Sequence, residues 1–381
     1  MREFVKNGHE VFWISPYEKR LGKETELTEY ERCSFLKVRT GNLQKTNFIE
    51  KGISTLRVGR QYLAAIQKYW GHITFDLIVY ATPPITLTPA IKKIKKKTSA
   101  KTYLLLKDIF PQNAVDLGVF SQKSPFFFYF RHREKQLYKL SDHIGCMSQA
   151  NVDFLLRHNP QINPDIVHIN PNSMEITERM PSVDSAAVRD AHGIPRDTMV
   201  FMYGGNLGRP QDIPFIIQCL KASQNRKDCF FAICGAGTDA PLLEAYIEQE
   251  QPENVRFFSH FPREEYHTLL SACDMGLIFL DHRFSIPNFP SRLLSYLTLS
   301  KPVLCCTDTS SDVGPIAKEN GFGDWCESDD PEAFRDAVDH LLTADLQAMG
   351  HNARSFLEKN YSVTRSYQTI INTITGDEEH Q

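Results

Sequence analysis

Short apolar runs alternate with helical patterns along the whole chain, and this alternation restricts the fold more than any other feature of the sequence. The short runs have the length and composition of strands, and the longer segments between them carry apolar residues at helical spacing. Alternating strands and helices are typical of a parallel sheet that is covered by helices on both faces. The predicted strands lie at 9–15, 33–38, 75–81, 101–106, 143–147, 166–169, 199–205, 230–237, 255–260, 275–280 and 302–306.

The alternation occurs twice, which predicts two Rossmann-like domains at 1–170 and 171–360. A chain of 381 residues is long enough for two domains. The stretch after Asn170 is rich in Pro, Asn and Ser, as interdomain connections often are. Residues 1–7 resemble the end of a helix, whereas an α/β domain normally opens with a strand. We therefore expect the first strand of the N-terminal domain to be missing.

Charge and cysteine content narrow the functional classes. The formal charge of -3 does not indicate a nucleic-acid-binding protein. The nine cysteines show no CxxC or Cys/His ligand spacing, so we expect reduced, buried thiols in a cytoplasmic protein with no metal site. Because no run of about 18 apolar residues and no signal peptide is visible, we expect neither a membrane span nor export by a cleaved leader.

The stretch from Phe279 to Asp312 predicts an anion-binding element. It runs from a strand through a loop with Pro287 and Pro290 into a helix, for which Ser291 is a candidate N-cap. A helix N-terminus at the carboxyl end of a strand offers free N–H groups to an anion, and Arg292 adds a planar cation that suits phosphate. The alternative is an ordinary strand–helix unit with a solvated arginine.

Two glycine-containing turns follow strands of the second domain. Gly204, Gly205 and Asn206 form one turn, and Gly235 and Gly237 belong to the other. A residue without Cβ lets the backbone approach a phosphate closely. Neither turn is a P-loop or a complete GxGxxG motif. Each turn alone has a structural explanation, but both converge with Arg292 at the carboxyl ends of strands.

Lys107 and Asp108 follow a strand of the first domain, where a substrate of a parallel sheet would lie. A carboxylate at this position can accept a proton from an attacking hydroxyl or stabilise an adjacent positive charge. The alternative is that Asp108 is a turn or N-cap residue and that Lys107 is solvated.

The segment 124–139 combines aromatic and basic residues. Phe126, Phe127 and Phe128 lie beside Arg131 and Arg133. Such a combination suits a bilayer surface, because rings lie at headgroup depth and cations meet anionic lipid. A core helix with one charged side explains the same pattern.

The order of motifs resembles a GT-B glycosyltransferase, and within that fold glycosyltransferase family 4, which includes bacterial enzymes of capsule, O-antigen and exopolysaccharide assembly. The resemblance covers nearly the whole chain. It rests on these stretches in this order: GHEV, YGGNLG, CGAG, VRFFSHFPREEYHTLLSACDMGLIFL and PSRLLSYLTLSKPVL.

The resemblance implies two domains that face each other across a cleft, with a C-terminal helix (361–381) that packs back on the first domain. It implies a retaining transfer from a nucleotide-sugar donor, bound by the second domain, to an acceptor held by the first. The family needs no essential metal or other cofactor. Gly205, Gly235 and Gly237 match its glycine turns, and Arg292 matches a phosphate-contacting cation.

The chain departs from the family pattern at several positions. Two glutamates of the family fall on Pro287 and Ser295, so sugar contact would come from the backbone around Pro287 and Asn288, and Ser295 would contact ribose. Two cations of many relatives fall on Asn206 and Gln211, which leaves Arg209 as the nearest cation. Lys107 or Asp108 replaces a histidine beside the transferred sugar.

The resemblance also implies a location and partners. The acceptor would be a saccharide or a polyprenyl-diphosphate-linked saccharide, and the enzyme would lie at the inner face of the bacterial membrane. Two alternatives stay open from the sequence: a sugar-nucleotide 2-epimerase, and a catalytically weak binding or scaffold protein.

Overall fold

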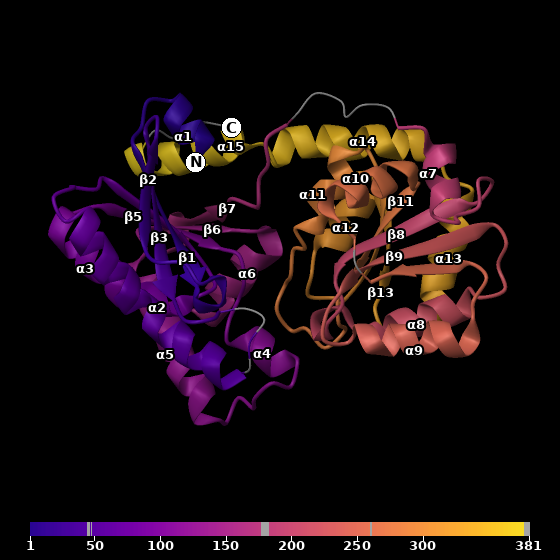
Figure 1. The fold of residues 1–381 in the computed structure, drawn as a ribbon, viewed down its shortest axis with the longest axis horizontal. Coiled ribbons are helices and arrows are strands. Elements are labelled where there is room, and N and C mark those ends of the chain that lie inside the picture. The colour runs from indigo at the N-terminus through magenta and orange to yellow at the C-terminus, as the bar shows by residue number, and fades with distance from the viewer. Residues whose placement is uncertain (44–45, 47, 177–182, 260, 377–381) are drawn as a thin grey trace.

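The computed structural model describes residues 1–376 except 44, 45, 47, 177–182 and 260. The chain forms two α/β domains that lie side by side in Figure 1, the first in indigo and magenta and the second mainly in pink and orange. Helices α14 (Leu346–Asn360) and α15 (Val363–Thr375) run along one side of the molecule, α14 over the second domain and α15 over the first. The chain therefore passes between the domains twice.

The strands of the first domain form two separate sheets. One sheet has the order β1-β3-β2, in which β2 is antiparallel to β3, and the other has the all-parallel order β4-β5-β6-β7. The strands are β1 (Val11–Glu18), β2 (Glu26–Tyr30), β3 (Cys33–Thr40), β4 (Leu77–Ala81), β5 (Lys101–Leu106), β6 (His143–Cys146) and β7 (Val167–Ile169).

The strands of the first domain are interrupted between β1 and β4. Among the described strands, β1 and β4 each pair along one edge only. Apolar side chains on both strands stay in solvent, since Trp13 is 49% exposed and Val79 is 40% exposed. In a parallel sheet that is covered on both faces such residues are normally buried.

Helices cover the sheets of the first domain. The long helix α2 packs on β3, where the side chains of Leu36, Val38, Ala65 and Trp70 form a small core. The helices are α1 (Arg2–Lys6), α2 (Phe48–Tyr69), α3 (Thr88–Thr98), α4 (Gln112–Asp116), α5 (Pro125–Leu140) and α6 (Gln149–His158), with short 3-10 helices η1 (Lys19–Leu21), η2 (Ile85–Leu87) and η3 (Pro164–Ile166).

The second domain is built on one parallel sheet of order β10-β9-β8-β11-β12-β13. Its central strands are buried on both faces: Val200 and Met202 point into one core, and Phe201 and Tyr203 into the other. This is the period-two alternation of a strand. The strands are β8 (Met199–Asn206), β9 (Cys229–Ala236), β10 (Val255–Phe258), β11 (Met275–Phe279), β12 (Val303–Thr307) and β13 (Gly323–Glu327).

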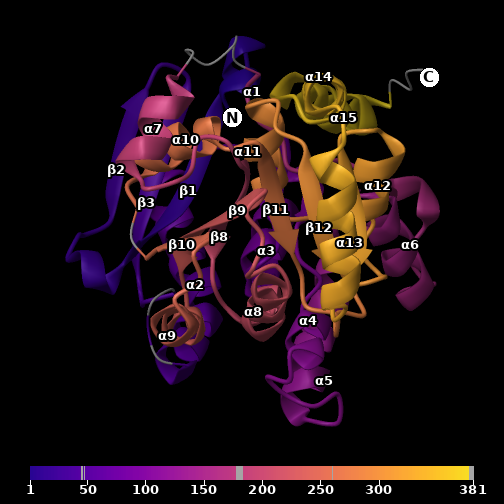
Figure 2. The same cartoon turned by 90° about the vertical axis from the view of Figure 1, so that its right-hand side faces the viewer.

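Helices cover both faces of this sheet (Figure 2): side chains of α8, α9 and α13 belong to one core, and side chains of α10, α11, α12 and α14 belong to the other. They are α7 (Ser185–Ala191), α8 (Ile213–Ala222), α9 (Ala240–Glu250), α10 (Arg263–Ala272), α11 (Arg292–Thr298), α12 (Val313–Glu319), α13 (Pro331–Leu342) and α14, with the 3-10 helix η4 (Arg209–Gln211).

The two passages between the domains lie against each other. The N–H of Met174 donates to the carbonyl of Tyr361 (2.8 Å), and the N–H of Val363 donates to the carbonyl of Met174 (3.0 Å). Beyond this point α15 packs on the first domain, where Tyr367 contacts Phe4 edge to face and its hydroxyl lies 2.9 Å from Nε2 of His9. The last helix therefore packs as part of the first domain.

All nine cysteines are buried and unpaired, which confirms the expectation of buried thiols. Within the described residues, no helix is both long and apolar enough to cross a membrane.

Candidate active site

The glycine segment that the sequence assigned to a turn forms the last residues of β8, where Gly204 pairs with Cys234 and Gly205 with Gly235 of β9. Gly205 has φ +140°, a conformation that side chains rarely adopt. A Cβ at Gly204 would lie 2.2 Å from the hydroxyl of Tyr266. Only glycine therefore fits at these two positions without rearrangement, and the turn exposes its backbone at the carboxyl edge of the sheet.

Arg292 is held against this turn, 88 positions away in sequence. Its Nη1 donates a 3.2 Å hydrogen bond to the carbonyl of Gly204, and its guanidinium lies 4.4 Å from the centre of the Tyr203 ring. Tyr296 anchors the same helix, because its hydroxyl donates to the carbonyls of Met202 (3.2 Å) and Leu277 (3.0 Å). The two carbonyls share the single proton of this hydroxyl, which ties the helix that carries the cation to two strands of the sheet.

Ser291 precedes α11 as predicted, but its side chain makes no capping hydrogen bond. The first turn is instead closed by backbone bonds, from Leu293 to Pro290 and from Leu294 to Ser291, each 3.2 Å. The prediction that Ser291 is the N-cap residue is therefore confirmed in position, but the cap is made without its side chain, and its backbone is already helical at φ -64° and ψ -17°.

The second glycine turn packs directly on the first. A Cβ at Gly235 would lie 2.0 Å from the carbonyl oxygen of Gly205, and one at Gly237 would lie 2.0 Å from that of Leu207. These glycines allow two backbone segments to pass in contact. Gly235 and Gly237 therefore serve the packing of β9 and its following turn against the end of β8.

Hydrogen bonds of Asn206, the last residue of β8, fix the end of this strand. Asn206 donates from Nδ2 to Oε1 of Gln211 (2.8 Å), and its carbonyl accepts a 2.5 Å bond from the Tyr203 hydroxyl. Arg209 is exposed and forms no ion pair with any other described residue. Arg209 is therefore a free cation at the same edge.

Backbone groups of the loop before α11 form hydrogen bonds within the protein. The carbonyl of Pro287 accepts a 2.8 Å bond from Nδ2 of Asn151 in the first domain. The N–H of Asn288 donates to Oγ of Ser311 (2.9 Å). Ser295 is half-buried, and its hydroxyl has no bond to another described residue. One carbonyl that the sequence assigned to sugar contact thus already has a partner across the domain boundary.

Lys107 and Asp108 lie at the carboxyl end of β5, beside the loop that follows β4. Thr82 joins the two loops: its Oγ1 accepts from the N–H of Lys107 (3.1 Å) and donates to the carbonyl of Asp108 (3.1 Å). Burial lowers the pKa of Lys107 to about 8, and desolvation raises the pKa of the Asp108 carboxyl. Neither side chain forms an ion pair within the described part of the chain.

The next residues of this segment reach the second domain. Ile109 is buried in the same core as Phe284 and Ile286. Asp116 accepts from the N–H and the hydroxyl of Ser285, both at 2.9 Å. Sequence reasoning missed these interdomain contacts, because a single aspartate in a short helix carries no signal of a distant partner.

Helix α5 carries the aromatic and basic segment. Phe126 and Phe128 are 65% and 64% exposed, whereas Phe130 packs on Phe110 with ring centres 5.0 Å apart. Phe127 is half-buried. The aromatic residues are therefore divided between solvent and the domain.

The cations of α5 are also divided. Arg131 is turned inward: it pairs with Glu134 and donates to Oδ1 of Asn159 (2.8 Å). Arg133 lies 5.3 Å from the Tyr129 ring, near the exposed aromatic residues. Of the two arginines, Arg133 is the one placed beside the exposed rings.

One group of side chains in the described residues could hold a metal ion. Ligand atoms of Asp212, Asp281 and His282 lie within 4.8 Å of one another. Arg283 already pairs with Asp281, through Nε at 2.8 Å and Nη2 at 2.5 Å. This ion pair neutralises the most buried carboxylate of the group, which disfavours a cation there.

Comparison with known proteins gives the class. Residues 184–356 match the family model of glycosyl transferases group 1. Over 290 residues the chain is 26% identical to "Probable glycosyltransferase WbjE" of Pseudomonas aeruginosa, which covers 75% of this chain and 71% of that protein. It is 23% identical over 317 residues to "Putative colanic acid biosynthesis glycosyl transferase WcaI" of Escherichia coli, covering 79% and 74%.

Solved structures share the fold. Sucrose-phosphate synthase from Thermosynechococcus elongatus superposes with a TM-score of 0.74 at 13% identity, covering 99% of this chain and 92% of that one. HepE from Anabaena, solved in complex with UDP-glucose, gives 0.64 at 14% identity, covering 90% and 86%. The chain therefore has the GT-B fold, and most of its second domain is similar to glycosyl transferases group 1.

Proposed function

We propose that the chain is a retaining glycosyltransferase of family 4 that moves a sugar from a nucleotide-sugar donor to a saccharide acceptor carried on polyprenyl diphosphate. The observation that carries this proposal is Arg292, held beside the Gly204–Gly205 turn at the carboxyl edge of the second sheet. The names of WbjE and WcaI support a glycosyltransferase, and that of WcaI supports polysaccharide biosynthesis. The HepE complex supports a nucleotide-sugar donor.

In this proposal the second domain stabilises the leaving diphosphate. Arg292 supplies a cation and the Gly205 turn supplies backbone N–H groups, both fixed before the reaction starts. Preorganised donors aimed at developing charge are among the largest contributions to catalysis. Because protein groups compensate the diphosphate charge, the reaction needs no essential metal ion.

The first domain would hold the acceptor beside the donor sugar. Bond cleavage gives the anomeric carbon oxocarbenium character, and the acceptor hydroxyl attacks from the face of the leaving group. The Asp108 carboxylate would stabilise that positive charge or accept the hydroxyl proton, and Lys107 would lie beside the transferred sugar. Contacts between Asp116 and Ser285 keep both loops together while water is excluded.

A lipid-linked acceptor requires the enzyme to reach a membrane surface. The exposed rings of Phe126 and Phe128 and the nearby Arg133 support a contact through α5 at the inner face of the bacterial membrane. Apolar rings enter the interface and cations meet anionic lipid.

A donor screen followed by product analysis tests the function. Nucleotides and nucleotide sugars are compared by thermal shift, because a ligand at 100 times its Kd stabilises the folded state by about 2.7 kcal/mol. The best donor is then incubated with and without a polyprenyl-diphosphate saccharide. A glycosylated lipid that keeps the donor's anomeric configuration is expected. An epimerised nucleotide sugar without acceptor supports a 2-epimerase, and binding without turnover supports a weak binding protein.

A further inference from the structure

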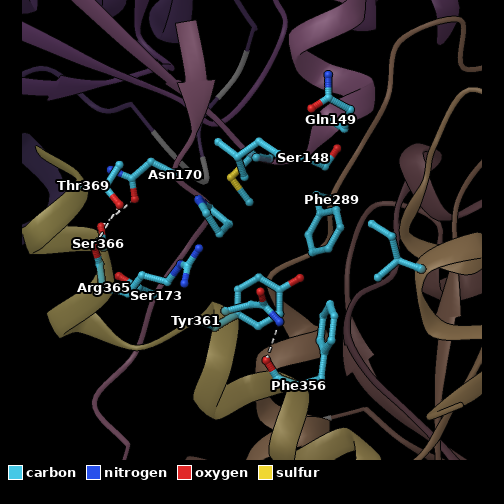
Figure 3. Close-up of a pocket in the computed structure, with 15 residues that line it drawn as sticks. Ser148, Gln149, Asn170, Ser173, Phe289, Phe356, Tyr361, Arg365, Ser366 and Thr369 are labelled. Atoms are coloured by element: carbon cyan, nitrogen blue, oxygen red, sulfur yellow. Dashed lines mark hydrogen bonds between the residues drawn. The ribbon is translucent and has the colours of Figure 1, made fainter. Parts of the chain in front are cut away.

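A pocket of about 250 Å³ lies where the chain passes between the domains. Figure 3 shows it between the end of β7, the N-terminus of α6 and the junction of α14 with α15. Its lining comes from both domains and from both passages. None of the lining residues belongs to the glycine turns, and Arg292 is not among them. The pocket therefore shares none of the candidate phosphate-binding groups, and it touches the candidate donor site only through Phe289 in the loop that precedes Arg292.

The pocket presents a cation that has no carboxylate partner among the described residues. Figure 3 shows the side chain of Arg365 pointing from α15 into the pocket. Its one hydrogen bond is a long one, from Nη1 to the carbonyl of Lys359 at 3.4 Å. Arg196, by contrast, pairs with the carboxylate of Asp190. Arg365 is thus available to an anion.

The remaining lining suits a hydroxylated ligand. Ser148, Gln149, Ser173 and Asn360 supply hydroxyl and amide groups, and Phe289 and Tyr361 supply aromatic rings. Hydroxyls and amides can bond to sugar hydroxyls, while rings cover the apolar face of a sugar. The volume is just below the roughly 300–1,000 Å³ of drug-sized sites, so a compact ligand fits.

The position of the pocket couples ligand binding to domain orientation. Ser366 of α15 donates a 2.7 Å bond to Oδ1 of Asn170, which ties the two passages together at the pocket wall. Ser148 and Gln149 belong to the first domain, whereas Phe289 belongs to the second. A ligand that touches both sets binds best when the domains keep this arrangement, and it therefore favours that arrangement.

We propose that this hinge pocket binds a monosaccharide phosphate, with the phosphate on Arg365 and the sugar against Phe289 and Tyr361, and that the ligand favours the observed orientation of the two domains. The site is regulatory and takes no part in sugar transfer. It stands independently of the proposed function, because a binding measurement without donor or acceptor tests it.

Isothermal titration calorimetry with glucose 6-phosphate is the direct test, with glucose and inorganic phosphate as separate probes. The wild type is expected to bind glucose 6-phosphate at least tenfold more tightly than either probe. Arg365→Ala and Arg365→Gln should each weaken binding at least tenfold. Lys359→Ala, which removes a neighbouring exposed cation outside the pocket, should not change it. Circular dichroism and melting temperature establish that each variant is folded.

Arg292→Ala separates this pocket from the donor site. We expect it to keep glucose 6-phosphate binding and to lose nucleotide-sugar binding. Small-angle scattering should show a narrower distribution of interdomain distances with glucose 6-phosphate than without it. The proposal is overturned if millimolar glucose 6-phosphate gives no heat, if both Arg365 variants bind like the wild type, or if Arg292→Ala abolishes the signal. An unchanged scattering profile overturns the coupling to domain orientation.

Discussion

The carboxylate of Asp116, at the end of α4 in the first domain, accepts two hydrogen bonds of 2.9 Å from Ser285 in the second. One comes from the Ser285 backbone N–H and the other from its hydroxyl. Ile109, one position after Asp108, is buried beside the residues that flank Ser285. The segment with the proposed acceptor-side groups and the loop leading to Arg292 are therefore held together.

Removing this contact should slow turnover more than it weakens donor binding. Asp116→Ala and Ser285→Ala each remove hydrogen bonds worth about 1 kcal/mol, so we expect kcat to fall about fivefold, with the donor Kd nearly unchanged. Asp116→Ala removes both bonds, whereas Ser285→Ala keeps the one from the backbone N–H, so the double variant should resemble Asp116→Ala. Asp165→Asn, an exposed carboxylate elsewhere in the first domain, is the control. Additive losses in the double variant would contradict a shared contact.

Arg292→Ala should lower donor affinity strongly. Loss of a charged hydrogen bond costs about 1.5–3 kcal/mol, which is roughly 10–150-fold in Kd. Arg335, a half-buried arginine on α13 of the same domain that pairs with Glu332, provides a control as Arg335→Ala. Calorimetry with the donor found by the screen measures both. Equal affinity in wild type and Arg292→Ala would exclude this arginine from the donor site.

Gly237→Ala should destabilise the second domain. The new Cβ would lie 2.0 Å from the carbonyl oxygen of Leu207, so backbone has to move. We expect a loss of about 1–3 kcal/mol in unfolding free energy, the range for overpacked sites. Gly52→Ala in helix α2 is the control, because a Cβ added there would have nothing within 4 Å. This variant should raise the unfolding free energy by about 0.5–1 kcal/mol. Urea unfolding measures both variants, and a neutral Gly237→Ala would show that the two turns are loosely packed.

Activity should fall as the pH rises through about 8 if the charge of Lys107 assists the reaction. Burial lowers its pKa to about 8, so the ammonium is lost above that pH. Arginine keeps its charge far above pH 8, so Lys107→Arg should remove this decline even if its maximum rate is lower. Profiles of kcat/KM from pH 6 to 10 test this, and an identical decline in both proteins would assign it to another group.

The lowered pKa of Lys107 also makes the free energy of unfolding depend on pH. Its pKa in the folded state, about 8, lies below the ordinary 10.5, so between these values the unfolded chain binds more protons than the folded one. The folded state is therefore stabilised as the pH rises through this window. Lys107→Met should be more stable than the wild type at pH 7, and the difference should shrink from pH 8 to 10.5. A difference that grows over this range would contradict the assignment.

Binding to vesicles should depend on the exposed rings of α5. Phe126→Ser with Phe128→Ser removes apolar area that lies in solvent, and we expect loss of flotation with vesicles that contain anionic lipid. Leu242→Ser, at a residue of the second domain that is 49% exposed, is the control. Wild-type binding should weaken with salt, because the cationic part of the contact is screened. A wild type that stays in solution with both neutral and anionic vesicles would make α5 a purely structural helix.

Local patterns predicted most of the fold. Most strands of both domains follow from short apolar runs, because a buried strand of a parallel sheet is apolar on both faces. Strands β2 and β13 were missed. Both lie at the edge of a sheet, and in the charged segment ELTEY of β2 four of five residues are exposed, so the apolar run that marks a central strand is absent.

The sequence by itself determined that Arg292 and the Gly204–Gly205 turn belong to one edge of the second domain, since the carboxyl ends of parallel strands meet there. Only the tertiary structure decided what these residues contact: the guanidinium lies on the Tyr203 ring, and Gly235 and Gly237 serve the packing of two turns. It also decided which rings of α5 face solvent and that Asp116 meets Ser285, 169 positions away. Periodicity reports on neighbours within a few residues, whereas such partners are set by how complete elements pack, which no local pattern records.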